Sequence, residues 1–509
     1  MNGREKSDPA IVAAKPANDA VSAAEELVER RAGARGNASG QRTHRTQGRE
    51  SVSKALERVR TAARERKAEK FTALLHHIND ELLRDSFNAI QRKAAPGVDG
   101  VKWKDYAADL DRNLTDLRDR IHRGAYRALP SRRVYIPKAD GRQRPLAVAA
   151  LEDKIVQRAA ATVLEAIYEE DFLGFSYGFR PGRGPHDALD ALAVAITTRK
   201  VSYILDADIQ AFFDRVSHDW LIKFLEHRIA DTRMLRLILK WLKVGVLEDG
   251  VVTPGELGTG QGSVISPLLA NVYLHYAFDL WAEQWRRREA KGDMIIVRYA
   301  DDIVVGFQHE ADAKRFQDDM GIRLAEFALT LHPEKTRLIE FGRFAAANRA
   351  RRGFDKPETF NFLGLTHICG RSRRGKFLLM RHTRRDRMRA KLKAVKVELM
   401  RRRHEPIPKQ GKWLGQVVGG FFGYHAVPTN SAALSAFLHH VKGLWRRALR
   451  RRSQKDRCTW AQIARLAVDF LPKPLIRHPW PRDRFAATHP RWEPYALIGP
   501  VRFCAGGVR

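Results

Sequence analysis

Cysteine is scarce in this chain of 509 residues, which contains only Cys369, Cys458 and Cys504. They are too few and too far apart to form a disulfide framework or a Cys-x-x-Cys zinc site. No run of 18 apolar residues occurs, so no transmembrane helix is expected. Residues 1–31 also lack the apolar centre of a signal peptide. These absences predict a cytoplasmic protein without a membrane segment.

Acidic residues are also in short supply, because the chain has 92 Lys and Arg against 59 Asp and Glu, a net charge of +33. A field of that sign and size predicts a polyanionic partner; nucleic acid is the first candidate and an anionic membrane the alternative. Residues 371–457 contain 25 Lys and Arg against four acids. Apolar residues at 434–445 follow i, i+3, i+4 spacing, so this segment is predicted to be a basic helical module that binds nucleic acid rather than a solvated surface.

Composition divides the chain into four predicted segments. Residues 1–67 have almost no aromatic side chains and are predicted to be a disordered basic tail, with some helix near its end. Residues 68–370 mix strand and helix patterns without regular alternation, which predicts an α+β domain. Residues 371–470 are predicted to be all-α, and residues 471–509, rich in Pro, Trp and Arg, an irregular basic extension.

The most informative motif is Tyr299-Ala300-Asp301-Asp302, which lies between the apolar runs 294–297 and 303–307. That pattern predicts two strands joined by a tight turn. Adjacent carboxylates on an apolar scaffold are costly unless a metal ion neutralises them. The motif alone is weak evidence, because Asp is common in turns.

A nucleotidyl transferase needs a further carboxylate from a second strand, since its divalent cations take oxygen ligands. The apolar strand predicted at 203–209 carries Asp206 and Asp208, which share one face at a spacing of two. Asp208 is the better candidate because it ends the strand, but the pattern alone does not separate the two. Asp214 opens the next helix and is explained equally well as a charge at a helix N-terminus.

Seven stretches occur in a fixed order along the chain: Ile136-Pro137-Lys138 with Arg144-Pro145-Leu146, Gly178 to Arg183, Asp208 to Asp214, Gln261 to Asn271, Tyr299 to Asp302, Glu334-Lys335-Thr336 and Phe362-Leu363-Gly364. In this order they resemble the motifs of reverse transcriptases encoded by bacterial group II introns. The resemblance extends from about residue 80 to the C-terminus. Two small departures, Gln210-Ala211 and Gly260, replace the family's usual residues without touching a candidate metal ligand.

The resemblance implies a right-hand polymerase: fingers and a palm with an antiparallel sheet, followed by an all-α basic thumb, or maturase, domain. It implies that Asp208, Asp301 and Asp302 are catalytic and bind two Mg²⁺ ions, with Mn²⁺ as an alternative, and that Asp206 is a bystander. The other implied roles are nucleotide binding by Lys138, Arg144, Phe213 and Gln261, template or primer contact by Arg180, Tyr299 and Lys335, and RNA or duplex binding by the thumb residues Arg384, Arg385, Arg446, Arg447, Arg450 and Arg451.

The implied function is an RNA-directed DNA polymerase that also acts as a maturase in intron splicing and mobility. Its implied partners are intron RNA, an RNA template–DNA primer duplex, dNTPs and target DNA, and both a monomer and a dimer are compatible with the sequence. A zinc-bearing His-Asn-His nuclease is not expected, because no Cys-x-x-Cys pair occurs.

Three alternatives remain open at this point. The first is a domesticated relative without an intron, used in DNA repair or phage defence. The second is a splicing cofactor without polymerase activity, against which the intact set of three aspartates counts. The third is an RNA polymerase, against which Phe213 counts, because the family places an aromatic residue there to block a 2′-hydroxyl.

Overall fold

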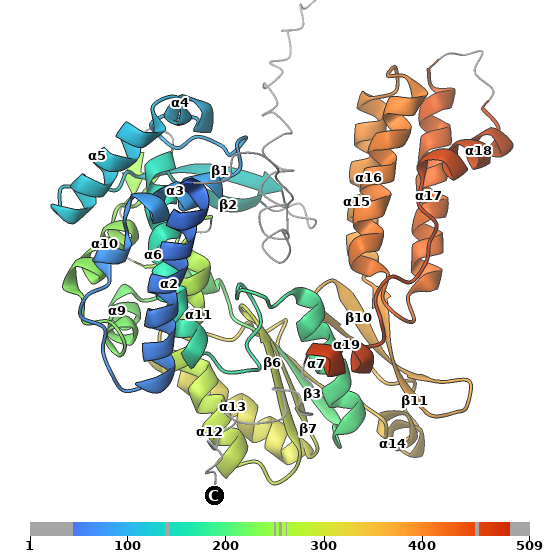
Figure 1. The fold of residues 1–509 in the computed structure, drawn as a ribbon. Coiled ribbons are helices and arrows are strands. Elements are labelled where there is room, and N and C mark those ends of the chain that lie inside the picture. The colour runs from blue at the N-terminus through green and yellow to red at the C-terminus, as the bar shows by residue number, and fades with distance from the viewer. Residues whose placement is uncertain are drawn as a thin grey trace, which may run out of the picture.

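The structure is a computed structural model that describes residues 44–137, 143–248, 251–253, 257–260, 262–452 and 458–488. It confirms the predicted α+β class, with three β-sheets and many helices in these ranges (Figure 1). None of the helices in this described part of the chain is long and apolar enough to cross a membrane.

The segment predicted as fingers is built around the long buried helix α6 (Leu151–Asp171). A hairpin of two antiparallel strands precedes it, with Arg132 opposite Val148. The predicted tip of that hairpin, residues 138–142, lies outside the described residues. The other elements here are η2 (Leu75–His77), α3 (Asp80–Asn88), α4 (Trp103–Ala107), α5 (Leu110–His122), β1 (Ser131–Pro137) and β2 (Gln143–Val148).

Helix α2 (His44–Glu65) agrees with the helix predicted near the end of residues 1–67, but it is docked on the protein and is not part of a disordered tail. Val52, Val59 and Ala63 are buried against the fingers core, and α2 packs along α6. The segment lacks aromatic residues, but its small apolar side chains lie on one helical face and are enough to dock it. The folded part of the chain therefore begins before residue 67.

The segment predicted as palm contains the antiparallel sheet expected from the sequence, in the order β6-β7-β3-β8. Alternate residues along each strand enter two different cores. Ile295 and Val297 pack toward α7 (Pro185–Thr198), whereas Ile296 packs with the helices on the other face. The strands are β3 (Tyr203–Asp208), β6 (Met294–Tyr299), β7 (Asp302–Phe307) and β8 (Arg337–Glu340).

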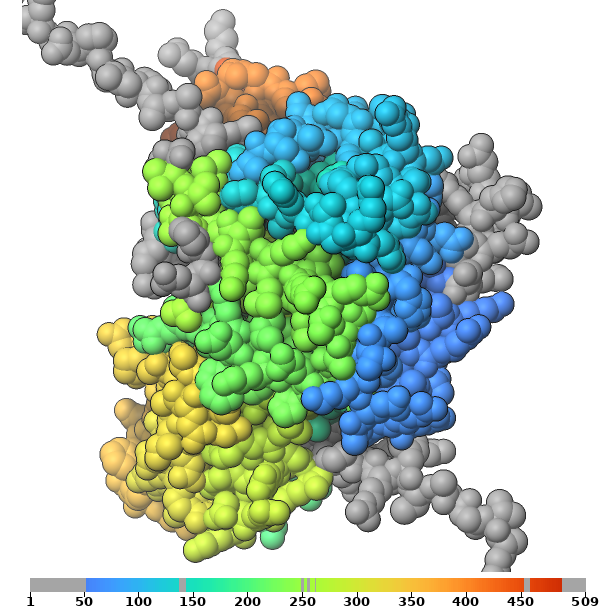
Figure 2. All heavy atoms as spheres, turned by 90° about the vertical axis from the view of Figure 1, so that its left-hand side faces the viewer, coloured from blue at the N-terminus to red at the C-terminus, as the bar shows by residue number. Residues whose placement is uncertain are grey.

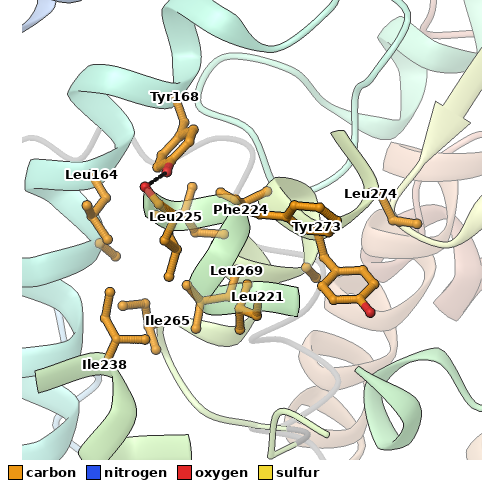
Figure 3. Packing of buried hydrophobic residues seen from close by; sticks show 14 of the residues in the cluster. Leu164, Tyr168, Leu221, Phe224, Leu225, Ile238, Ile265, Leu269, Tyr273 and Leu274 are labelled. Carbon is orange, nitrogen blue, oxygen red and sulfur yellow. Dashed lines mark hydrogen bonds between the residues drawn. The ribbon is translucent and has the colours of Figure 1, made fainter. Parts of the chain in front are cut away.

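A continuous apolar core joins the palm helices to the fingers (Figure 3). Leu164 of α6, Leu225 of α9 and Ile238 of α10 meet there, and the Tyr168 hydroxyl donates to the Leu225 carbonyl at 3.4 Å. Figure 2 shows this part of the molecule from another side, with the N-terminal segments in blue and cyan packed against the palm helices in green. The remaining helices and strands between residues 212 and 351 are α8 (Phe212–Arg215), α9 (His218–Glu226), α10 (Thr232–Lys243), β4 (Val246–Glu248), β5 (Val251–Thr253), α11 (Ser266–Leu274), the π-helix η3 (His275–Asp279), α12 (Leu280–Arg288), α13 (Glu310–Glu326) and α14 (Ala345–Arg351).

The basic segment predicted to be all-α from residue 371 begins instead with a strand. β9 (Phe360–Phe362), β10 (Leu365–Arg371) and β11 (Phe377–Thr383) form a small antiparallel sheet. The helices follow and enclose a core of their own around Leu414, Phe437 and Trp445. They are α15 (Arg385–Arg401), α16 (Ile407–His425), α17 (Ser431–Arg450) and α18 (Trp460–Phe470).

The segment after α18 returns to the palm and ends in helix α19 (Pro481–Thr488), which packs against α7 (Figure 1). Arg484 of α19 lies 3.3 Å from the carboxylate of Asp190 in α7. The extension predicted to be irregular from residue 471 therefore contains a docked helix. Residues 489–509 of that extension lie outside the described residues.

Candidate active site

The strand register brings the predicted aspartates to one edge of the palm sheet. Asp208, the last residue of β3, lies directly opposite Asp302, the first residue of β7. Residues directly opposite each other on adjacent strands share one face of the sheet. Asp302 in turn pairs with Tyr299 across the β6–β7 hairpin, so Asp301 lies in the turn between them.

The turn itself has an unusual backbone. Ala300 has a left-handed φ of 55°, which costs an L-residue about 1 kcal/mol. Gly178 lies against this turn so closely that a Cβ atom there would be 2.2 Å from the Ala300 nitrogen. The first residue of the predicted fingers motif 178–183 thus has to be glycine for the turn to keep its position.

Negative charge accumulates at this edge of the sheet. Burial, followed by repulsion from Asp301, Asp208 and Asp206, raises the pKa of Asp302 to about 7. Burial and the charge of Asp208 also raise the pKa of Asp301. The Asp302 side chain is accessible to water. Its carboxylate is therefore only partly desolvated, and it lies among like charges rather than inside the apolar core. A bound cation would relieve this repulsion.

A lysine already neutralises part of the cluster. The ammonium Nζ of Lys335 lies 2.6 Å from Oδ2 of Asp208. The same segment holds the Asp208 backbone, because the His332 amide donates to the Asp208 carbonyl at 2.7 Å. The segment that carries the motif Glu334-Lys335-Thr336 therefore contacts the end of β3. The template or primer contact that the sequence predicted for Lys335 remains a prediction.

The three carboxylates suit a hard divalent ion by donor type and by charge. As the side chains stand, however, no three His, Cys, Asp or Glu side chains among the described residues are close enough to hold a metal ion. Asp208 is turned toward Lys335 instead. An ion that binds Oδ2 of Asp208 would replace the Lys335 ammonium there.

Phe212 and Phe213 follow Asp208 in the short helix α8 and have different environments. Phe212 is buried in the core, whereas Phe213 is only half-buried. The Phe213 carbonyl accepts a hydrogen bond from the Thr259 amide at 2.8 Å. Gly258 has a φ of 86°, and a Cβ atom there would lie 2.8 Å from the same carbonyl. The 257–260 segment therefore fixes the backbone of Phe213.

Comparison with known proteins agrees with this geometry. The family described as reverse transcriptase (RNA-dependent DNA polymerase) matches residues 136–367. Protein YkfC of Escherichia coli is 36% identical over 277 residues, which cover 48% of this chain and 72% of YkfC. The group II intron-encoded protein LtrA of Lactococcus lactis is 33% identical over 222 residues, 43% of this chain and 37% of LtrA.

The chain belongs to the group II intron family of reverse transcriptases. An uncharacterized 91 kDa protein in the cob intron of Schizosaccharomyces pombe is also 36% identical, over 202 residues, 39% of this chain and 24% of that protein. The reverse transcriptase thus spans well under half the length of these two intron-encoded relatives. The family match assigns RNA-directed DNA polymerase activity to the fingers and palm, and this family uses divalent metal ions.

Of the residues predicted to bind the nucleotide, Arg144 lies on the fingers hairpin. Arg144 is exposed on β2 and lies near enough to the turn to lower the pKa of Asp301. Its guanidinium thus contributes positive charge near the carboxylate cluster, and its role in binding the triphosphate remains a prediction. Lys138 and Gln261, also predicted to bind the nucleotide, lie outside the described residues.

Two residues predicted to contact template or primer are packed inside the protein to different degrees. Arg180 is buried, and its guanidinium donates to the Ser176 and Leu173 carbonyls at 2.8 Å and to Glu169. This position is structural and does not agree with the predicted template contact. Tyr299 is half-buried, with its ring 6.5 Å from that of Phe179.

The arginines predicted to bind RNA or duplex in the thumb fall into two groups. Arg446 is half-buried over the ring of Trp460 and donates to the Cys458 carbonyl at 3.1 Å, so it holds α18 on the bundle. Arg384 is half-buried and paired with Asp386. The remaining four expose their side chains: Arg385, Arg447, Arg450 and Arg451.

Sequence reasoning missed one buried residue next to the site, Arg298. It is the only charged residue in the otherwise apolar strand β6, and its guanidinium donates to the Ala300 carbonyl at 3.0 Å. A charge inside an apolar strand needs a buried partner. That break in the apolar run was the signal available in the sequence.

Proposed function

We propose that this reverse transcriptase synthesises DNA on RNA templates, with Asp208, Asp301 and Asp302 as the site for two Mg²⁺ ions. One observation carries the proposal: Asp208 and Asp302 oppose each other across two strands, and burial together with like charge raises the pKa of Asp302 to about 7. An electrostatic arrangement that is unfavourable without a cation is expected at a metal-dependent active site.

The ions would activate the primer 3′-hydroxyl and stabilise the leaving pyrophosphate. Around them, each side chain has a separate task in the proposal. Asp208 at the end of β3 and Asp301 in the β6–β7 turn hold the metal site, and Arg144 binds the phosphate oxygens of the incoming nucleotide. Phe213 lies under the sugar and excludes a 2′-hydroxyl, while Tyr299 supports the primer end.

The basic thumb is proposed to bind the template–primer duplex and the folded RNA of a group II intron. RNA helices are recognised by phosphates, 2′-hydroxyls and shape, which suits a helical surface with exposed Arg385, Arg450 and Arg451. Intron splicing and insertion into target DNA would follow from this binding. The proposal places the enzyme in the cytoplasm, where these nucleic acids are found.

Primer extension on a defined RNA template, with dNTPs or NTPs and Mg²⁺, tests the polymerase. We expect DNA products only, and none from the double variant Asp301→Ala, Asp302→Ala. The same double variant tests the maturase role, because it leaves the thumb intact. It should still promote splicing of the intron RNA; loss of splicing by a folded double variant would contradict two separable functions.

A further inference from the structure

Arg298 is fully buried and uses all five of its guanidinium N–H groups. Nε and Nη2 bind the two carboxylate oxygens of Asp279 at 2.7 and 2.5 Å. The other donors reach Asn271 Oδ1 at 3.1 Å, the Ala300 carbonyl at 3.0 Å and Ser176 Oγ at 2.7 Å. Because each of the five N–H donors has an acceptor, the Arg298 side chain is held in a single orientation.

The acceptors come from parts of the chain that are distant in sequence. Asn271 lies on α11 and Asp279 on the π-helix η3, a rare helical form that is frequent at functional sites. Ser176 lies in the segment just before the fingers motif 178–183. Arg298 therefore joins the palm helices, the fingers and the turn between β6 and β7 at one point.

The segment at Ser176 is attached to β6 by its backbone as well. The Arg298 amide donates to the Phe175 carbonyl at 2.9 Å, and the Tyr177 amide donates to the Arg298 carbonyl at 2.8 Å. Asn271 also donates to the Gly178 carbonyl at 2.7 Å. Gly178 lies directly against Ala300, so the left-handed turn is contacted from two sides by this one network.

We propose that Arg298 and Asp279 are positioning residues, which fix the left-handed turn at Ala300 so that Asp301 is presented to the metal site. The inference rests on the proposed role of Asp301 as a metal ligand. Arg298 itself is buried beneath the turn, and the two residues act through the backbone carbonyl of Ala300. The same network makes the position of the turn depend on the fingers segment Phe175–Gly178.

A merely structural ion pair would stabilise the palm without affecting the turn, and the chain offers a matched control for that possibility. Arg381 and Asp190 form a second buried pair, with Nη1 of Arg381 2.7 Å from Oδ1 of Asp190, whose other oxygen lies 3.3 Å from Arg484. This pair joins β11 to α7, whereas the Arg298–Asp279 pair is hydrogen-bonded to the turn through the Ala300 carbonyl. Replacing both members of a buried pair by apolar residues is tolerated far better than removing one.

The test compares the double variant Arg298→Met, Asp279→Leu with the control Arg381→Met, Asp190→Leu. Amide hydrogen exchange of the metal-free protein is measured at residues 299–302, and Mn²⁺ affinity by electron paramagnetic resonance. We expect faster exchange at the turn and Mn²⁺ binding weaker by about tenfold or more in the first variant only. Unchanged exchange and affinity, or equal changes in both variants, would overturn the proposal.

A milder variant keeps the test decisive if the first double variant does not fold. Asn271→Ala removes one acceptor of Arg298, leaves the ion pair with Asp279 in place, and should shift exchange and Mn²⁺ affinity in the same direction by a smaller factor. No shift in either would count against the network. Failure of the proposed function is distinguishable, because wild-type protein would then show neither Mn²⁺ binding nor primer extension, whereas the exchange result is read without metal.

Discussion

Asp208 and Asp302 occupy directly opposed positions on β3 and β7, at the edge of the palm sheet where β3 ends and β7 begins. This pairing places two carboxylates on one face before any ion is present. The only cation bound to either carboxylate among the described residues is the Lys335 ammonium on Asp208. The strand pairing of the backbone therefore positions the carboxylates, and most of their negative charge is not neutralised by the protein.

Asp302→Asn should abolish DNA synthesis and yet stabilise the metal-free protein. The amide keeps the shape of the carboxyl group and removes a charge that Asp301, Asp208 and Asp206 repel. Because Asp302 is accessible to water, the gain in free energy of unfolding at pH 8 is expected to be only about 1 kcal/mol. Urea unfolding with EDTA measures it; a destabilised variant would contradict the electrostatic account.

The pH dependence of metal binding should follow Asp302. Its pKa is about 7 in the folded protein against an ordinary value of 3.8. The folded state thus retains a proton that the unfolded state loses, so stability of the metal-free protein should fall as pH rises from about 4 to 7 and level off above.

Mn²⁺ competes with that same proton and should bind about tenfold more tightly at pH 8 than at pH 6. Titrations at the two pH values check this. Asp302→Asn is the control, since its affinity should lose most of the pH dependence. Equal wild-type affinities at both pH values would show that Asp302 is already ionised at pH 6.

Lys335→Met should strengthen binding of Mn²⁺ to the protein without nucleotide. The ammonium group occupies an oxygen of Asp208 that the ion needs. The pair is partly exposed, so its removal is expected to tighten binding by only about two- to fivefold. Calorimetric titration with Mn²⁺ gives the value, and weaker binding in the variant would mean that Lys335 organises the site instead of competing for it.

Phe213→Val should reduce discrimination against ribonucleotides by about ten- to a hundredfold, as expected when a contact with one group of the substrate is lost. Single-nucleotide incorporation with dNTPs and NTPs measures the ratio. Phe212→Val is the matched control, because Phe212 is buried in the core. It should lower stability and leave sugar selection unchanged; equal selectivity in wild type and Phe213→Val would rule out the proposed steric role.

Replacing exposed thumb arginines should weaken binding of duplex and intron RNA in a salt-dependent way. The triple variant Arg385→Gln, Arg450→Gln, Arg451→Gln should reduce the slope of log K against log salt by about 2 to 3. Arg446→Gln is the control, since that guanidinium is bound to the Cys458 carbonyl. It should affect thermal stability and leave the slope nearly unchanged. The same slope in wild type and triple variant would place the duplex elsewhere.

Local patterns in the sequence were sufficient for the centre of the site. The apolar runs on either side of Asp301 and Asp302 predict the hairpin, and a strand that ends in Asp208 supplies its partner. The choice of Asp208 over Asp206 came from family resemblance and remains a prediction, since the two residues share a face.

These local patterns could not predict packing between segments that are distant in the sequence. Nothing local indicates that α19 docks on α7 or that α2 packs on α6, because both depend on surfaces distant in the chain. The role of Arg180 as a template contact came from the family resemblance, and the partners that bury it, Glu169 and the Leu173 carbonyl, cannot be identified from the local sequence.

Primer extension on an RNA template by two single variants, Asp208→Asn and Asp206→Asn, tests the central claim most directly. The two residues lie on the same strand face two positions apart, and Asp206 already has Arg337 at 3.9 Å as a charge partner. The account predicts that Asp208→Asn stops DNA synthesis while Asp206→Asn retains most of it. Full activity of a folded Asp208→Asn variant, or equal loss in both, would contradict it.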